Sequence, residues 1–202
     1  MFEIDIAKYK KYDKPGPRYT SYPTAPQFNE AFTHENLLDE ILKTNYGENL
    51  PDLSLYYHLP YCDTLCYFCG CNMIITRNRD RVKEYVRYIK KEMDIIRSYL
   101  LTDRKVSQLH WGGGTPTHLN PDEIADLASY IQASFSFKEN AENSCEIDPR
   151  GLTHEHLAAL RNNGFNRISM GVQDFNEKVH RTVRRVNQTK RMSLLGFSVK
   201  IE

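Results

Sequence analysis

The chain has 202 residues, and its 27 lysines and arginines nearly balance 26 aspartates and glutamates, which leaves a formal net charge of +1. That length favours one domain with a sizeable core, and the balanced charge argues against a dedicated nucleic-acid-binding or anionic-membrane-binding protein. No apolar run reaches the roughly 18 residues that span a bilayer, and the opening residues lack the apolar core of a secretory signal. We therefore expect a cytoplasmic monomer without nucleic-acid or membrane partners.

Residues 1–52 are predicted to form an irregular N-terminal arm, because prolines punctuate it with turn signals. One short helix is expected within the arm, beginning at Thr33, since apolar residues recur on one side of it at Leu37, Leu38, Ile41 and Leu42. The arm also contains Tyr12, Tyr19 and Tyr22. These tyrosines either fold over the ligand site described below or pack against neighbouring residues without a functional role.

From Leu53 onward, strand-like and helix-like segments alternate. Strands are predicted at Leu53–Leu59, Val106–Trp111, Cys145–Asp148 and Arg167–Gln173. Helices are predicted at Asp80–Leu101, from the capped start Asn120–Pro121 onward, and at Thr153–Asn163. Such alternation predicts an α/β fold with a parallel sheet, and right-handed crossovers would curl that sheet towards a barrel.

Each predicted strand has one apolar and one polar face. In the first strand, for example, Leu55, Tyr57 and Leu59 alternate with polar neighbours, and successive side chains of a strand point to opposite faces. If the helices cover the apolar faces, the polar faces line the inside and form a ligand cavity. A half-solvated antiparallel sheet is the alternative, which the intervening helices disfavour.

Four of the five cysteines lie close together, directly after the first predicted strand, at Cys62, Cys66, Cys69 and Cys71. Disulfides rarely persist in the cytoplasm, so the spacing indicates metal ligands. Three thiolates spaced CxxxCxxC can hold three irons of a [4Fe–4S] cluster and leave the fourth iron open. Zinc is the alternative, with Cys71 as a fourth sulfur, although structural zinc sites usually split their ligands into two separated pairs.

Several segments together resemble the radical S-adenosylmethionine (SAM) superfamily and, within it, the family of oxygen-independent coproporphyrinogen III oxidases. These segments are Tyr56–Cys62 with the CxxxCxxC motif, Cys69–Cys71, Pro17–Pro23, His110–Thr117, Glu146–Arg150 and Gly164–Phe175. The resemblance covers residues 15–186 and implies that residues 53–202 are the first part of a radical SAM (β/α) barrel.

The resemblance implies that Cys62, Cys66 and Cys69 bind the [4Fe–4S] cluster and that SAM chelates its open iron. The reduced cluster would cleave SAM to a 5′-deoxyadenosyl radical, which removes hydrogen from a propionate side chain of the porphyrinogen so that carbon dioxide leaves. Two such steps convert coproporphyrinogen III to protoporphyrinogen IX. A second SAM molecule and a one-electron reductant are also implied.

The same resemblance implies a set of SAM contacts at Tyr56, Phe68, Gly113, Gly114, Thr115, Glu146, Gln173 and Arg185. Glycines permit close backbone approach to a ligand, and Arg185 is a fixed cation suited to a carboxylate. Alternatives remain for some of them. The glycine run also fits a simple strand-to-helix turn, and Phe68 also fits packing.

Two residues are assigned to the catalytic site. His58 is placed there as a proton donor or as a group that positions a propionate, although a lone histidine is most often structural. Cys71 is given a supporting role near the cluster. Cys145, on an apolar strand face, is expected to be a buried hydrophobe.

The sequence is about half as long as the family leads one to expect. Arg191–Phe197 resembles the end of the next helix and Ser198–Glu202 the start of a fifth strand, with Glu202 near the position of a further SAM contact. A truncated chain would expose an unpaired strand edge, so weak stability and little activity are expected. The alternatives to an oxidase are a haem-chaperone-like relative and a non-catalytic metal-binding module.

Overall fold

The computed structural model of the chain describes residues 10, 25–46, 50–101 and 103–185. By its internal contacts the chain divides into two compact units, residues 1–40 and residues 41–202. The described part of the first unit contains a 3₁₀ helix, η2 (Ala25–Gln27), and most of α2 (His34–Lys43). The helix expected to begin at Thr33 is thereby confirmed.

Some predictions fall outside the described residues. They concern the arm tyrosines, the segment Pro17–Pro23, and the helix and strand expected in residues 191–202. The division into an arm of residues 1–52 and a barrel domain also stays a prediction. None of the helices in the described ranges is both long and apolar enough to cross a membrane.

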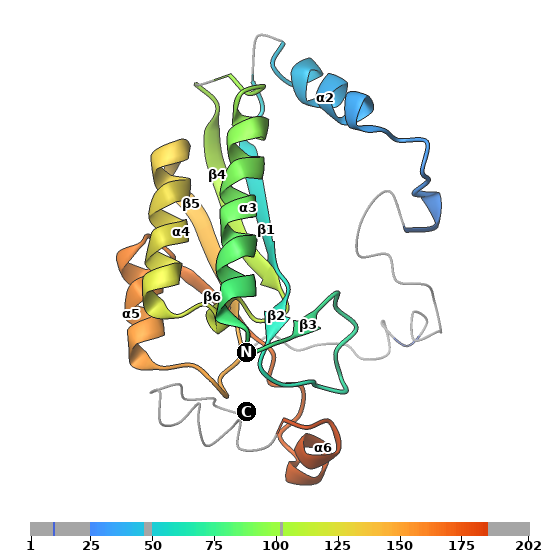
Figure 1. Ribbon diagram of the computed structural model, residues 1–202, viewed down its shortest axis with the longest axis vertical. Coiled ribbons are helices and arrows are strands. Elements are labelled where there is room, and N and C mark those ends of the chain that lie inside the picture. Colours follow the sequence, from blue (N-terminus) through green and yellow to red (C-terminus); the bar gives the residue numbers. More distant parts are fainter. Residues whose placement is uncertain (1–9, 11–24, 47–49, 102, 186–202) are drawn as a thin grey trace. The chain divides into compact units, whose positions relative to one another are not determined.

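The second unit is built on a four-stranded parallel sheet of order β1-β4-β5-β6 (Figure 1). Its strands are β1 (Leu53–Leu59), β4 (Lys105–Gly113), β5 (Ser136–Ile147) and β6 (Arg167–Met170). The connecting helices are α3 (Arg79–Arg97), α4 (Pro121–Ser134) and α5 (His154–Asn162). Parallel neighbours need such long crossovers, and the predicted α/β fold with a parallel sheet is confirmed.

Two strand boundaries differ from the prediction. β5 begins at Ser136, nine residues before Cys145, because its first half pairs with β4 although it is mostly polar and shows no alternation. β6 ends at Met170 and not at Gln173, since Gln173 has a φ of 72° and has left the extended conformation.

Smaller elements also depart from the prediction. α3 ends at Arg97, because the backbone N–H of Ser98 already closes its last turn, whereas Leu101 was expected as the end. Four short elements had no sequence signal strong enough to predict them: β2 (Tyr61–Cys62), β3 (Ile74–Ile75), η3 (Pro116–His118) and α6 (Glu177–Thr182).

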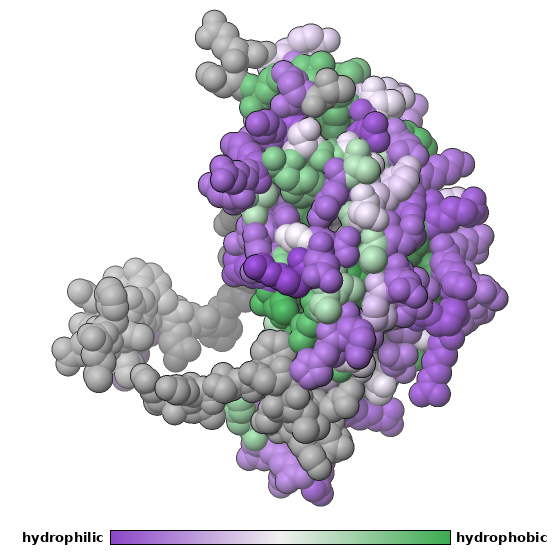
Figure 2. All heavy atoms as spheres, turned by 90° about the vertical axis from the view of Figure 1, so that its left-hand side faces the viewer, coloured by the Kyte–Doolittle hydropathy of each residue, from purple (hydrophilic) through white to green (hydrophobic). Residues whose placement is uncertain are grey.

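The apolar strand faces and the three long helices enclose the core. Trp111 of β4 is fully buried at its centre, and its ring meets that of Phe165 edge-on at 4.8 Å between centroids. From the helices the core takes Val82, Val86, Ile89, Met93, Ile124, Leu127, Ile131 and Leu160. Figure 2 shows the side on which α4 and α5 lie in Figure 1, and hydrophilic residues cover most of its described part.

The polar strand faces are accessible. Ser54 and Gln108 are exposed, and Tyr56 is 58% exposed. The two-faced pattern is confirmed for β1, β4 and the second half of β5. It is not confirmed for β6, where Ile168 on the expected apolar face is 39% exposed. Because the described strands form an open sheet, the polar face is a surface here and not the closed, ligand-holding interior that was expected.

The start of α4 offers a test of local stability. The Asn120 side chain accepts a hydrogen bond from the N–H of Glu123, whose carboxylate accepts one from the N–H of Asn120, both at 2.9 Å. Asn120→Ala removes this cap and should lower the free energy of unfolding by about 1 kcal/mol, measured by urea denaturation. Ser129→Ala, on the exposed side of the same helix, should change it by less than about 0.5 kcal/mol. Equal effects would contradict the capping argument.

Candidate functional site

The candidate site lies at the carboxyl ends of β1, β4 and β5, where α/β folds place their chemistry. β1 leads into β2, and the chain then forms the cysteine loop (residues 62–71) before returning to β3. Backbone hydrogen bonds fasten the base of the loop: Ile74 donates to Pro60 at 2.7 Å, and Thr76 donates to Cys62 at 3.1 Å. The four cysteines therefore project from a short segment anchored at the edge of the sheet.

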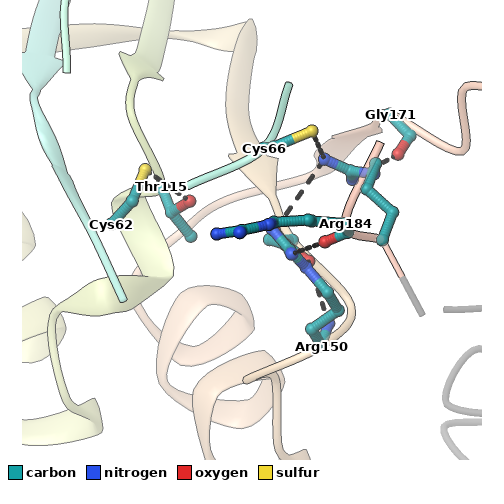
Figure 3. Close-up of polar contacts among 8 residues, drawn as sticks. Cys62, Cys66, Thr115, Arg150, Gly171 and Arg184 are labelled. Atoms are coloured by element: carbon teal, nitrogen blue, oxygen red, sulfur yellow. Dashed lines mark hydrogen bonds and ion pairs between the residues drawn. The ribbon is translucent and has the colours of Figure 1, made fainter. Parts of the chain in front are cut away.

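Cys62 and Cys66 have separate partners (Figure 3), whereas Cys69 and Cys71 contact each other. The sulfur of Cys62 lies 3.2 Å from the hydroxyl of Thr115. Buried Cys66 accepts a hydrogen bond from Nη1 of Arg185 at 3.6 Å. Cys69 and Cys71 are exposed, and the backbone N–H of Cys71 donates to the sulfur of Cys69 at 3.4 Å. All four are free cysteines, as the prediction of metal ligands requires.

The donor chemistry of the loop fits an iron–sulfur cluster, since thiolates are the ligands that such clusters take. Whether the loop is already arranged to hold a single metal ion is a separate question. Within the described residues, no three or more His, Cys, Asp or Glu side chains are gathered closely enough to hold a metal ion. In a cluster the three thiolates would bind three different irons, so Cys62, Cys66 and Cys69 need not converge on a single ion.

Two thiols of the loop, those of Cys62 and Cys71, have raised pKa values. Burial raises the pKa of Cys62, an effect partly offset by the hydrogen bond with Thr115. Burial, the hydrogen bond to Cys69 and nearby negative groups raise the pKa of Cys71. Because a metal binds thiolates, loading the loop must release protons.

Two arginines converge on one carboxylate beside the loop. Asp148, just after β5, accepts hydrogen bonds from Arg150 Nε at 3.0 Å and from Nη2 at 2.5 Å. Nη1 of Arg185 lies 4.0 Å from the same carboxylate, and its Nη2 donates to the carbonyl of Gly171 at 2.6 Å. Burial by itself raises the pKa of Asp148, but the hydrogen bonds and charge of Arg150, followed by the charge of Arg185, outweigh it and lower the pKa.

Sequence reasoning missed the roles of Asp148 and Arg150, although both lie in the quoted Glu146–Arg150 motif. A signal was available: an Asp-Pro-Arg run directly after a strand places charged groups at the functional edge of a parallel sheet. The expected SAM contact Arg185 does lie at this edge, next to Cys66.

The polar face of the sheet brings four further side chains together. His58 is 2.8 Å from the carbonyl of Asn72 and 3.2 Å from the hydroxyl of Tyr56. The Tyr56 ring stacks on His110 at 5.8 Å, and His110 lies 3.5 Å from Glu146. His58 thus contacts the chain just after the cysteine loop, which agrees with the structural alternative, and its proton-donating role stays a prediction.

The glycines at the end of β4 begin a tight turn against the base of the loop. Gly113 has a φ of 112°, and a Cβ atom on Gly114 would lie 2.5 Å from the carbonyl oxygen of Pro60. The backbone N–H of Gly114 donates to the carbonyl of Leu59, and that of Thr115 donates to the carbonyl of Tyr61, both at 2.9 Å. These bonds hold the turn against the base of the loop. The turn itself is therefore confirmed, and SAM contacts of Gly113, Gly114 and Thr115 stay predictions.

The remaining predicted contacts are accessible. Phe68 is 60% exposed, and both its SAM contact and its packing over the cluster stay predictions. Gln173 is exposed and holds a left-handed φ of 72°, a strained conformation of the kind that clusters at functional sites. Glu146 is partly exposed on the polar face of β5. Cys145, in contrast, is fully buried on the apolar face, as expected.

Comparisons with known proteins show the family of the chain. The model of the radical SAM superfamily matches residues 56–196. An oxygen-independent coproporphyrinogen III oxidase of Mannheimia haemolytica is 47% identical over 151 residues, which are 74% of this chain and all of that sequence. The chain belongs to the radical SAM superfamily and, within it, to the oxygen-independent coproporphyrinogen III oxidase family.

Longer relatives show how much of this family the chain contains. The enzymes of that name from Helicobacter pylori (strain 26695) and Escherichia coli K12 are 45% and 48% identical over 92% of this chain, but over 41% and 39% of their own lengths. The solved E. coli coproporphyrinogen III oxidase, described as a radical SAM enzyme, matches 96% of this chain and 42% of its own with a TM-score of 0.81 and 42% identity. The chain thus spans about two fifths of these relatives and matches part of a radical SAM barrel.

Proposed function

We propose that the chain forms the cluster-binding part of an enzyme that oxidatively decarboxylates coproporphyrinogen III to protoporphyrinogen IX without oxygen. The observation that carries this proposal is the cysteine loop at the carboxyl end of β1, in a chain that matches coproporphyrinogen III oxidases at 40% identity and above. The substrate would be this porphyrinogen, and the partner a one-electron reductant.

Cys62, Cys66 and Cys69 would hold the [4Fe–4S] cluster. When bound with SAM, the cluster would supply the electron for the radical chemistry of that cofactor. The protein surroundings suit a negatively charged thiolate site, because Arg185 already donates to Cys66 and Arg150 stands beside it across Asp148. Cys71 is left as a supporting residue outside the ligand set.

SAM would lie between the glycine turn, the polar face of the sheet and the arginines. Glu146 and Gln173 would offer a carboxylate and an amide for the amino and hydroxyl groups of SAM. Arg185 is placed to pair with a carboxylate. Tyr56 and Phe68 offer aromatic faces, and a second SAM molecule would share this surface.

The proposal is tested by anaerobic reconstitution with iron and sulfide, followed by electron paramagnetic resonance of the reduced chain with and without SAM. A signal that SAM shifts identifies a cluster with an open iron. Cys145→Ala is the matched control, because Cys145 lies on the far, apolar face of β5 and should leave the shift unchanged. One bound zinc without iron, or a cluster signal that SAM does not alter, would refute the proposal.

A further inference from the structure

Arg184, two residues after the end of α6, has an unusual backbone conformation. α6 ends in a Schellman motif, with the N–H of Arg185 bonded to the carbonyl of His180 at 2.8 Å and the N–H of Arg184 to that of Arg181 at 3.3 Å. This motif places Arg184 at the left-handed position, with a φ of 57°. Glycine is the usual residue there and asparagine the next, because a Cβ atom is disfavoured in that conformation. An arginine at this position therefore calls for an explanation outside the helix.

The α6 turn (Val183–Arg185) contacts the cysteine loop residue by residue. The carbonyl of Val183 accepts a hydrogen bond from the N–H of Tyr67 at 3.2 Å. The guanidinium of Arg184 lies 4.7 Å from the centre of the Tyr67 ring. Arg185 donates to the sulfur of Cys66. The three residues of the turn therefore contact two adjacent residues of the loop, Cys66 and Tyr67. Nearly 120 positions separate the turn from the loop in the sequence.

The α6 turn is itself fixed to the sheet. Nη1 of Arg150 donates to the carbonyl of Arg184 at 2.7 Å, and the rest of that guanidinium is bound to Asp148 at the end of β5 (Figure 3). The path from the sheet to the loop thus runs from Asp148 through Arg150 and the α6 turn to Tyr67.

We propose that Arg184 is a positioning residue for the cysteine loop: its side chain clamps Tyr67 and so keeps the loop docked at the end of the sheet. The left-handed backbone and the ring contact together point to this role. If Arg184 served only to end α6, a glycine or asparagine would end it with less strain. The importance of the clamp for a cluster rests on the proposed function, whereas the docking of the loop does not.

Arg184→Asn separates the two roles. Asparagine tolerates the left-handed conformation but cannot reach the ring with a cation, so the urea midpoint of unfolding should stay equal or rise. In the same cluster-free chain, hydrogen exchange at the amides of Tyr67 and Cys69 should become about two- to fivefold faster, the factor that corresponds to one exposed cation–π contact. Arg184→Lys keeps the cation and should exchange nearly as the parent does.

Two further variants complete the test. Tyr67→Leu should accelerate exchange at Cys69 as Arg184→Asn does, and the double variant should add little, because both remove the same contact. Arg87→Gln, which removes a comparable contact with Tyr88 on α3, should leave exchange in the loop unchanged. After reconstitution, Arg184→Asn should release iron to a chelator faster than the parent and Arg87→Gln should not.

The proposal is overturned if Arg184→Asn leaves the rates of amide hydrogen exchange at Tyr67 and Cys69 unchanged. It is also overturned if the urea midpoint of this variant falls far enough to account for its faster exchange. Independent, additive effects of Arg184→Asn and Tyr67→Leu would also overturn it. Failure of the parent chain to bind iron would refute the proposed function alone, because the exchange measurement uses the cluster-free chain.

Discussion

Replacing Cys66 by alanine is expected to reduce the iron and sulfide retained after anaerobic reconstitution by more than about tenfold, since mutations that only disturb the support of a metal ligand already cost 10- to 100-fold in affinity. Two thiolates cannot take the place of three on a [4Fe–4S] cluster. The measurement is iron and sulfide per chain after removal of unbound metal, together with the visible absorption of the cluster.

The chain provides matched controls for this experiment. Cys145 is fully buried on the apolar face of β5, and burial raises the pKa of its thiol far above the usual value, so Cys145→Ala should retain the cluster. Cys71→Ala should also retain it, because Cys71 lies outside the proposed ligand set. If Cys66→Ala retains as much iron and sulfide as the parent, the cluster does not bind at Cys66. If the bound metal is lost in Cys71→Ala, a zinc site with four sulfur ligands is favoured.

Replacing Asp148 by asparagine is expected to cost about 3–5 kcal/mol of unfolding free energy, the usual effect of removing one partner of a buried ion pair. The Asp148 side chain is only 14% exposed, and two guanidinium groups face it, those of Arg150 and Arg185. Asparagine keeps the shape but not the charge, so both cations lose their counter-charge in a buried place. Urea denaturation of the metal-free chain measures the loss.

Glu142→Gln is the matched control, on β5, the strand that ends just before Asp148. Glu142 pairs with Arg167 at 2.6 Å, but both side chains are more than 40% exposed, and such a pair contributes about 1 kcal/mol or less. A cost for Asp148→Asn that is no larger than the cost for Glu142→Gln would show that the two arginines do not depend on the carboxylate.

The cost of Asp148→Asn should also depend on pH. The folded chain holds the pKa of Asp148 below its ordinary value of 3.8, so near that pH the unfolded chain binds the proton more readily. The stability that the carboxylate contributes is therefore fully present above about pH 4 and is lost as the pH falls through the lowered pKa. The difference in unfolding free energy between the parent and Asp148→Asn should therefore become smaller in acid. A difference that becomes larger below pH 4 would contradict the lowered pKa of Asp148.

The local patterns of the sequence determined much of this fold. Alternation of apolar and polar residues gave β1 its full extent, Leu53–Leu59, and identified its buried face. The Asn120–Pro121 pair marked the beginning of α4 within one residue. The spacing of the cysteines placed the candidate site at the end of β1. These features could be predicted because each depends on residues that are close together along the chain.

Only the tertiary structure decided the rest. The polar first half of β5 is a strand because β4 pairs with it, and no local periodicity reports such pairing. Cys66 meets Arg185, and Tyr67 meets Arg184, because the end of α6 returns to the edge of the sheet after nearly 120 residues. The sequence thus determines which residues carry the chemistry, whereas long-range packing decides which of them touch, since it depends on the whole chain and not on any short segment of it.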